Sequence, residues 1–105
     1  MYEVFVTNEF EEKIERWDKK DRESVEKIYN QLTENPYVGD QISYPFLREK
    51  KISGKRIYYL IYDDLVLVLM VATSSKKDQQ KTINSIKNKL PEFRRLAEEA
   101  SKRHV

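Results

Sequence analysis

The chain has 105 residues, which is enough for one small domain, and it contains no cysteine, which excludes a disulfide framework and a thiolate metal site. Its net charge of +2 hides an uneven distribution: residues 1–40 carry 6 basic and 11 acidic side chains (−5), and residues 41–105 carry 14 and 7 (+7). This asymmetry predicts a polyanionic partner for the second part of the chain, and mutual attraction of the two parts within the fold is the alternative.

Hydropathy gives no sign of a membrane protein. No apolar stretch near the start has the character of a signal peptide, and the longest apolar run, Leu65 to Ala72, is too short to cross a bilayer. We therefore expect a cytoplasmic protein without a membrane partner.

The first third of the sequence predicts a strand followed by two helices. Residues 2–7 alternate in the manner of a strand, and Asn8 and Glu11 have the spacing of a capping box, which predicts a helix from Asn8. A break over 18–21 precedes a second helix, which ends at Asn35 and Pro36. Each helix carries one apolar stripe, formed by Phe10, Ile14 and Trp17 in the first and by Val25, Ile28, Tyr29 and Leu32 in the second.

The rest of the chain predicts three strands and a C-terminal helix. After a loop over 37–44, strands are expected over 46–52, 55–62 and 65–73, joined by two short turns. The third is apolar from Leu65 to Ala72, so it should be central and covered on both faces. Asp78 is expected to cap a helix that Pro91 interrupts, with a helical extension from about residue 91. The predicted fold is α+β, in the order β-α-α-β-β-β-α. A small, mostly antiparallel sheet packs against an N-terminal helical hairpin and a C-terminal helix in a single domain over 1–105.

Three segments carry a resemblance to a known family. The first is the helical hairpin that closes with an Asn-Pro stop at 35–36. The second is the strand Gly54–Tyr59, with a glycine, an arginine and tyrosines in that order, and the third is the basic pair of Lys76 and Lys77 directly after the long apolar strand. In this order and spacing, over roughly residues 2–90, the sequence resembles the RelE/ParE superfamily of toxins from type II toxin–antitoxin systems. The segment that begins at Lys76 also looks like the ending of HigB-like relatives.

The resemblance implies a RelE-like fold and a definite activity. The expected protein is a toxin that inhibits translation as a ribosome-dependent mRNA endonuclease, that is, a hydrolase that needs no metal or other cofactor. Its expected partners are mRNA on the ribosome and a cognate antitoxin, with which it would form a hetero-oligomer. Two alternatives stay open: a ParE-type toxin that acts on DNA gyrase without nuclease activity, and an RNA-binding domain without catalysis.

Metal-independent RNA cleavage requires a base for the 2′-hydroxyl, cations for the phosphorane and an acid for the leaving oxygen. Arg56 suits the second task, because its guanidinium can hold two phosphate oxygens, and the alternative is a surface arginine paired with Glu49. The predicted catalytic residues are Arg56, Lys77, Lys51 and Lys55. The predicted RNA-binding residues are Arg48, Lys50, Lys76 and Tyr59.

The two lysines beside the Ser53-Gly54 turn are candidates for the base. Lys51 and Lys55 are expected to face each other across the hairpin, and crowded cations would lower the pKa of a lysine toward neutrality. The same crowding also suits phosphate binding without chemistry. Tyr59 is expected to stack on a base, although strand alternation sends at least one tyrosine of this strand into the core.

The sequence departs from the family at two points. Ile83 stands where a RelE-type site often has a tyrosine, and the only histidine, His104, lies close to the end of the sequence, where we expect no catalytic role. Both absences remove candidates for acid–base chemistry and leave phosphate binding unaffected.

Overall fold

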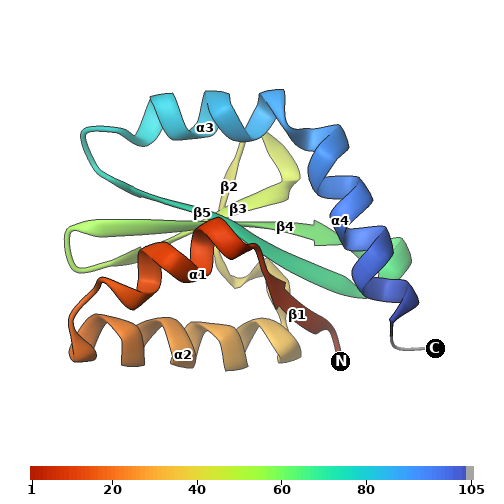
Figure 1. Cartoon of the computed structure of the whole chain (residues 1–105), viewed down its shortest axis with the longest axis horizontal. Coiled ribbons are helices and arrows are strands. Elements are labelled where there is room, and N and C mark those ends of the chain that lie inside the picture. Colours follow the sequence, from red (N-terminus) through yellow and green to blue (C-terminus); the bar gives the residue numbers. More distant parts are fainter. Residues whose placement is uncertain (104–105) are drawn as a thin grey trace.

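A computed structural model describes residues 1–103 as one five-stranded sheet with helices on both faces (Figure 1). The elements are β1 (Glu3–Val6), α1 (Asn8–Glu15), α2 (Lys19–Glu34), β2 (Asp40–Ile42), β3 (Tyr44–Ile52), β4 (Lys55–Tyr62), β5 (Leu67–Ser75), α3 (Gln79–Asn88) and α4 (Leu90–Lys102). The predicted α+β order is confirmed, together with the interruption of the last helix near Pro91, which the structure places between Asn88 and Leu90. The structure adds the short strand β2.

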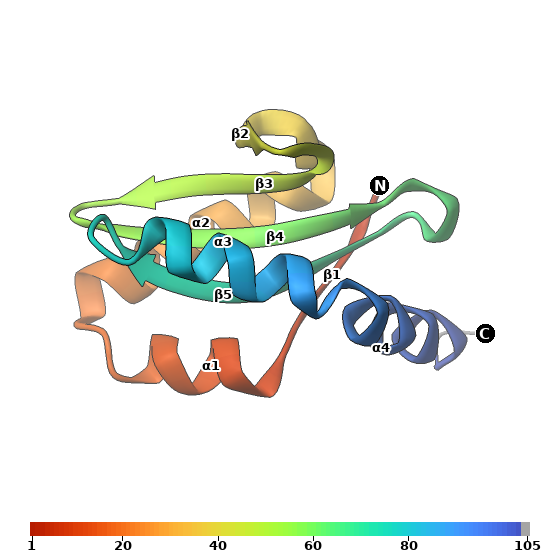
Figure 2. The ribbon, with the colours of Figure 1, turned by 90° about the horizontal axis from the view of Figure 1, so that it is seen from above.

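The strands lie in the order β1-β5-β4-β3-β2, with β1 parallel to β5 and the other pairs antiparallel. Helices α1 and α2 pack on one side of the sheet, and α3 and α4 pack on the other (Figure 1). Seen from above, α3 crosses in front of the strands (Figure 2). The prediction that β5 is covered on both faces is confirmed. Because β1 is short, it pairs with Leu67–Met70 alone, and β5 extends past it to Ser75.

The core has two parts, one on each side of the sheet. On the α1–α2 side, Phe10 and Leu32 pack against the β4 residues Ile57, Tyr59 and Ile61. On the α3–α4 side, the buried residues include Leu47, Tyr58, Leu60, Ile83, Ile86 and Phe93. Strand alternation therefore buries both sets of β4 side chains, because helices cover both faces of the sheet.

Two of the predicted helix caps are wrong. The N-cap of α1 is Thr7 rather than Asn8, because the Thr7 hydroxyl oxygen accepts a hydrogen bond from the amide of Phe10 at 3.1 Å. Asp78 stands before α3, but its carboxylate caps no amide of the helix. Instead, the hydroxyl oxygen of Ser75, the last residue of β5, accepts a hydrogen bond from the amide of Asp78 at 3.3 Å.

The predicted start of β3 and both predicted limits of β5 are displaced by two residues. β3 begins at Tyr44 instead of residue 46, and β5 spans Leu67–Ser75 instead of 65–73. The second shift arises because Asp63–Leu65 form a 3-10 turn and Val66 adopts a left-handed conformation with φ 50°. The connection from β4 to β5 is therefore longer than a two-residue hairpin turn. None of the helices within residues 1–103 is both long enough and apolar enough to cross a membrane.

Candidate nucleic-acid interface

Strand register brings part of the predicted cationic set to one end of the sheet. Lys51 of β3 lies opposite Arg56 of β4, which lies opposite Ser74 of β5. Opposed residues in antiparallel strands point to the same face, so these side chains form a row. The β3–β4 turn and the β5–α3 connection lie at the same end of the sheet (Figure 1). The exposed Lys76 and Lys77 lie in that connection.

Arg56 and Glu49 form a buried pair next to this row. Their side chains are only 10% and 3% exposed, and Arg56 Nη1 lies 3.8 Å from Glu49 Oε1. Glu49 also accepts a hydrogen bond from Gln79 Nε2 of α3 at 2.7 Å. Among the described residues, Arg56 Nε is the one buried side-chain nitrogen or oxygen without a hydrogen-bond partner. Such a buried donor costs about 1–3 kcal/mol, so an oxygen-rich anion that accepted from it would remove this cost.

Tyr58 lies on the same face and forms a polar cluster with Arg56, Glu49, Gln79 and Ser74. Its hydroxyl lies 2.8 Å from the hydroxyl of Ser74, and its position in β4 is opposite Glu49. Burial raises the pKa of Tyr58 to about 12, and the negative charge of Glu49 acts in the same direction. Tyr58 is therefore protonated at neutral pH and is unsuited to act as a base.

The prediction for Lys55 is wrong in two respects. The turn pairs Lys55 with Ile52, so Lys51 faces Arg56 and not Lys55. Lys55 lies on the α1–α2 face, where its ammonium donates a hydrogen bond to Asp21 at 2.7 Å and lies 5.3 Å from the centre of the Trp17 ring. The hydrogen bond to Asp21 raises the pKa of Lys55, which is the opposite of what a lysine base requires.

Arg48 and Tyr59, both predicted to bind RNA, are held by main-chain groups between Pro36 and Pro45. Arg48 donates from Nε to the carbonyl of Pro45 at 2.8 Å and from Nη1 to that of Gly39 at 3.1 Å. Tyr59 has no exposed surface, and its hydroxyl donates to the Pro36 carbonyl at 2.7 Å. It cannot stack on a base, so we correct its assignment from RNA contact to core. The physical reason is that α2 and the turn after it cover this face of β4.

The remaining predicted residues have simpler surroundings. Lys50 is half-buried opposite Ile57, which places it on the α1–α2 face and away from Arg56. Ile83 is buried in the core below α3, and His104 lies outside the described residues.

The sequence interpretation named Glu49 only as a possible partner of Arg56 at the surface, whereas the structure buries this pair. It placed neither Gln79 nor Ser74 in the site, nor Tyr58 beside Glu49. A signal was available for Glu49, because it is the only acid in the basic stretch 48–56. It also lies two residues before Lys51, so strand alternation places both side chains on the same face. No comparable signal in the sequence connects Gln79 with Glu49, since 30 residues separate them.

The strand order and the helices on both faces define an α+β protein, and comparison with solved structures identifies its fold as that of RelE. No protein-family model matches the sequence, and no curated protein sequence matches it. The structure is similar to a free-state mutant of the E. coli toxin RelE, with a TM-score of 0.71 and 18% identity over 83% of this chain and 96% of that chain. A chain of the intact E. coli RelBE toxin–antitoxin complex matches with a TM-score of 0.65 and 19% identity, over 71% of this chain and 96% of that chain.

A third similar structure is the toxin–antitoxin complex RelBE2 from Mycobacterium tuberculosis. Its TM-score is 0.61 at 16% identity, over 71% of this chain and 91% of that chain. The RelE-like fold expected from the sequence is thus confirmed. At these identities the similarity establishes the fold, and the activity has to be argued from the site.

Proposed function

We propose that this chain is the toxin of a toxin–antitoxin pair and that the Arg56 end of its sheet binds and cleaves mRNA on the ribosome. The observation that carries the proposal is the unpartnered Nε of buried Arg56, in one row with the exposed Lys51. The RelE fold supports the same class of function. Such a toxin would be a single cytoplasmic domain over 1–105.

The chemistry would be metal-independent phosphodiester transfer. A base would remove the 2′-hydroxyl proton, the 2′-oxygen would bond to phosphorus, and the 5′-oxygen would leave with a proton. Arg56 would donate to the non-bridging oxygens, and Lys51 would add positive charge. Glu49, whose carboxylate lies beside Arg56, is the candidate base.

Lys76 and Lys77 would contact neighbouring phosphates, because they are exposed at the same end of the sheet. Lys55 has no place in this site, because Asp21 holds it on the opposite face.

Access to the pair requires movement of one side chain. The pair of Glu49 and Arg56 is almost fully buried, and Gln79 covers the carboxylate. A phosphate would therefore reach Arg56 after Gln79 releases Glu49. This step would make cleavage depend on the position of the first turn of α3.

The partner and the alternative function follow from separate observations. Two similar structures are toxin–antitoxin complexes, which supports a cognate antitoxin and a hetero-oligomer for this chain as well.

A phosphate-binding domain without catalysis is the second candidate, because Lys55 is unavailable as a base and Arg56 is buried.

The test is to add the purified chain to translating ribosomes and to map the mRNA ends. We expect cuts within the A-site codon. Lys51→Ala should slow cutting about tenfold, and Arg56→Ala should slow it by about 10²- to 10³-fold, the loss seen when one transition-state donor is removed. Lys102→Ala, an exposed lysine of α4, is the matched control and should cut normally.

Other outcomes separate the alternatives. Intact mRNA together with blocked DNA supercoiling by gyrase would replace the nuclease with a ParE-type toxin. RNA binding that depends on Lys51 but leaves the RNA intact would identify the non-catalytic domain.

A further inference from the structure

A partly exposed aromatic pair lies at the start of β3, outside the polar cluster around Arg56. The rings of Tyr44 and Phe46 are stacked, with centroids 5.0 Å apart and planes inclined by 3°, and Tyr44 is 37% exposed. The turn before the pair is irregular, because Ser43 is left-handed with φ 64° and the β2–β3 register shifts after Gln41. Such irregularities redirect a side chain from the regular strand alternation, and they are common next to functional sites.

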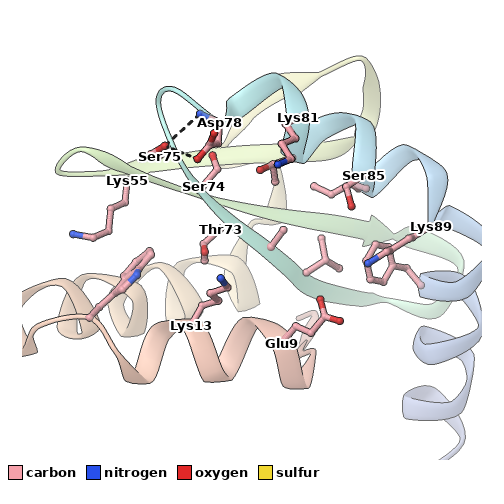
Figure 3. Close-up of a pocket in the computed structure, with 16 residues that line it drawn as sticks. Glu9, Lys13, Lys55, Thr73, Ser74, Ser75, Asp78, Lys81, Ser85 and Lys89 are labelled. Carbon is pink, nitrogen blue, oxygen red and sulfur yellow. Dashed lines mark hydrogen bonds between the residues drawn. The ribbon is translucent and has the colours of Figure 1, made fainter.

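A lysine of α3 lies over this aromatic pair. Lys87 Nζ is 5.7 Å from the centre of the Tyr44 ring, and within residues 1–103 this lysine forms no ion pair. The other lysine of α3, Lys81, extends into the groove between α1 and α3, as does Lys89 directly after the helix (Figure 3). α3 itself contains these two lysines and no acidic residue, so the helix surface attracts anions.

α3 connects the aromatic pair with the Arg56 end of the sheet. Gln79, the first residue of the helix, contacts Glu49 of β3. Lys87 contacts Tyr44 of the same strand. The two helix residues are eight positions apart, which is about 12 Å along the axis at about 1.5 Å per residue. About three or four stacked bases of one strand span this distance, at about 3.4 Å each. A single RNA strand can therefore reach both places.

The chemistry of this surface is suited to a nucleotide. Aromatic rings bind the bases of single-stranded nucleic acids by stacking, and a lysine beside the ring binds the phosphate. A base can replace the ammonium over Tyr44, because a cation–π contact at an exposed site is weaker than base stacking. The chain neighbours Ser43, Pro45 and Asn88 are exposed and form no apolar patch. The central part of a protein interface would be more apolar than this surface.

We propose that Tyr44 is a stacking platform for one base of a single-stranded RNA and that Lys87 binds the adjoining phosphate. The inference rests on the proposed function, because it adds a second contact to the RNA strand that reaches Arg56. Phe46 supports the Tyr44 ring on the strand. The platform tolerates different bases, because every base has an aromatic face. It holds the strand at a fixed distance from the scissile phosphate, so it contributes to RNA binding and not to the chemical step.

The experiment measures the affinity of the full chain for five-nucleotide RNAs by fluorescence anisotropy. The RNAs carry 2′-O-methyl groups, which block the attacking oxygen, and each has one abasic nucleotide at a different position. For the parent chain, one abasic position should weaken binding by about fivefold or more, the lower end of the contribution of base–aromatic stacking. In Tyr44→Leu the intact RNA should bind as weakly, and this abasic RNA should bind no worse. Tyr44→Phe, which keeps the ring, should behave as the parent.

Salt dependence tests the phosphate contact. Lys87→Ala should weaken binding of the intact RNA, and the slope of log affinity against log salt concentration should become shallower by about 0.7, the value for one phosphate on a single strand. Lys102→Ala, at an exposed position of α4, is the matched control and should keep the parent affinity and slope.

The proposal is overturned if Tyr44→Leu binds every RNA as the parent does, or if the abasic position weakens binding equally in both chains. It is also overturned if Tyr44→Leu keeps RNA binding but loses a self-association that the parent shows in sedimentation, since the pair would then be a protein contact. Cleavage on ribosomes separates the two proposals. Intact mRNA with a Tyr44-dependent abasic effect removes the nuclease and keeps the platform, and cut mRNA without that effect does the reverse.

Discussion

Gln79 Nε2 lies 2.7 Å from Glu49 Oε2, and this hydrogen bond ties the first turn of α3 to the buried carboxylate beside Arg56. α3 therefore does more than cover the sheet, because its first residue also closes the polar cluster. The connection before α3 carries Lys76 and Lys77, so a movement of this turn would also reposition these two lysines.

The variant Gln79→Ala tests this closure. A hydrogen bond to a charged group contributes about 1.5–3 kcal/mol, so we expect a loss of that order in the free energy of unfolding. Because the alanine exposes Glu49 and Arg56, RNA should bind about tenfold more tightly, as measured by titration with a single-stranded oligonucleotide. Gln80→Ala, which removes only an exposed hydrogen bond to Asn84, is the control. Equal RNA affinity in the two variants would show that Gln79 does not limit access.

Gly39 and Gly54 form a matched pair for testing the packing around Tyr59. A Cβ atom on Gly39 would lie 2.6 Å from the Tyr59 hydroxyl oxygen and 2.8 Å from the Glu49 carbonyl oxygen, whereas one on Gly54 would meet nothing within 4 Å. We expect Gly39→Ala to lower the free energy of unfolding by about 1–3 kcal/mol, a typical cost of overpacking. Gly54→Ala should change it by less than about 0.5 kcal/mol. Urea unfolding of both variants measures the difference, and equal stabilities would contradict the geometry.

Tyr59→Phe separates the core role of this tyrosine from the RNA contact expected at first. The Tyr59 hydroxyl donates to the Pro36 carbonyl and accepts from the Gly39 amide at 3.0 Å, so its loss leaves two buried main-chain groups unpaired. The cost should be about 1–3 kcal/mol of unfolding free energy, with RNA affinity unchanged. Tyr44→Phe, at an exposed position, is the control. A weaker RNA complex with unaltered stability would restore the first assignment.

Acid should destabilise the fold through three aspartates. Hydrogen bonds from Lys55, Tyr37 and Arg94 hold the pKa values of Asp21, Asp63 and Asp64, respectively, below their usual range. A carboxyl group whose pKa is lower in the folded state stabilises the fold above its unfolded pKa of about 3.9, and this contribution is lost as the pH falls through the folded value. Urea unfolding between pH 7 and pH 3 should show stability falling mainly below about pH 4.

Asp63→Asn is the variant that checks the source of this pH dependence. Its unfolding free energy should fall less steeply with acid than that of the parent chain, because one of the three titrating groups is gone. An exposed variant such as Glu12→Gln should keep the parent profile. The interpretation fails if the Asp63→Asn curve has the parent slope.

The sequence by itself determined the order of the elements and the two apolar faces of β5, and it singled out Arg56 as a candidate phosphate ligand. These features depend on local signals: periodicity, helix stops and the position of one arginine in a strand after a glycine. The same local signals place Ile83 and Ile86 on the inner side of α3, where the structure buries them.

Tertiary structure alone decided which polar side chains meet. The turn at Ser53, with φ 53°, pairs Ile52 with Lys55, and this register places Lys51 beside Arg56 and sends Lys55 to the other face. There Lys55 meets Asp21, which is 34 residues away in the chain. Partners so distant in sequence leave no periodic signal, because they are set by register and by the packing of separate segments onto the two faces of one sheet.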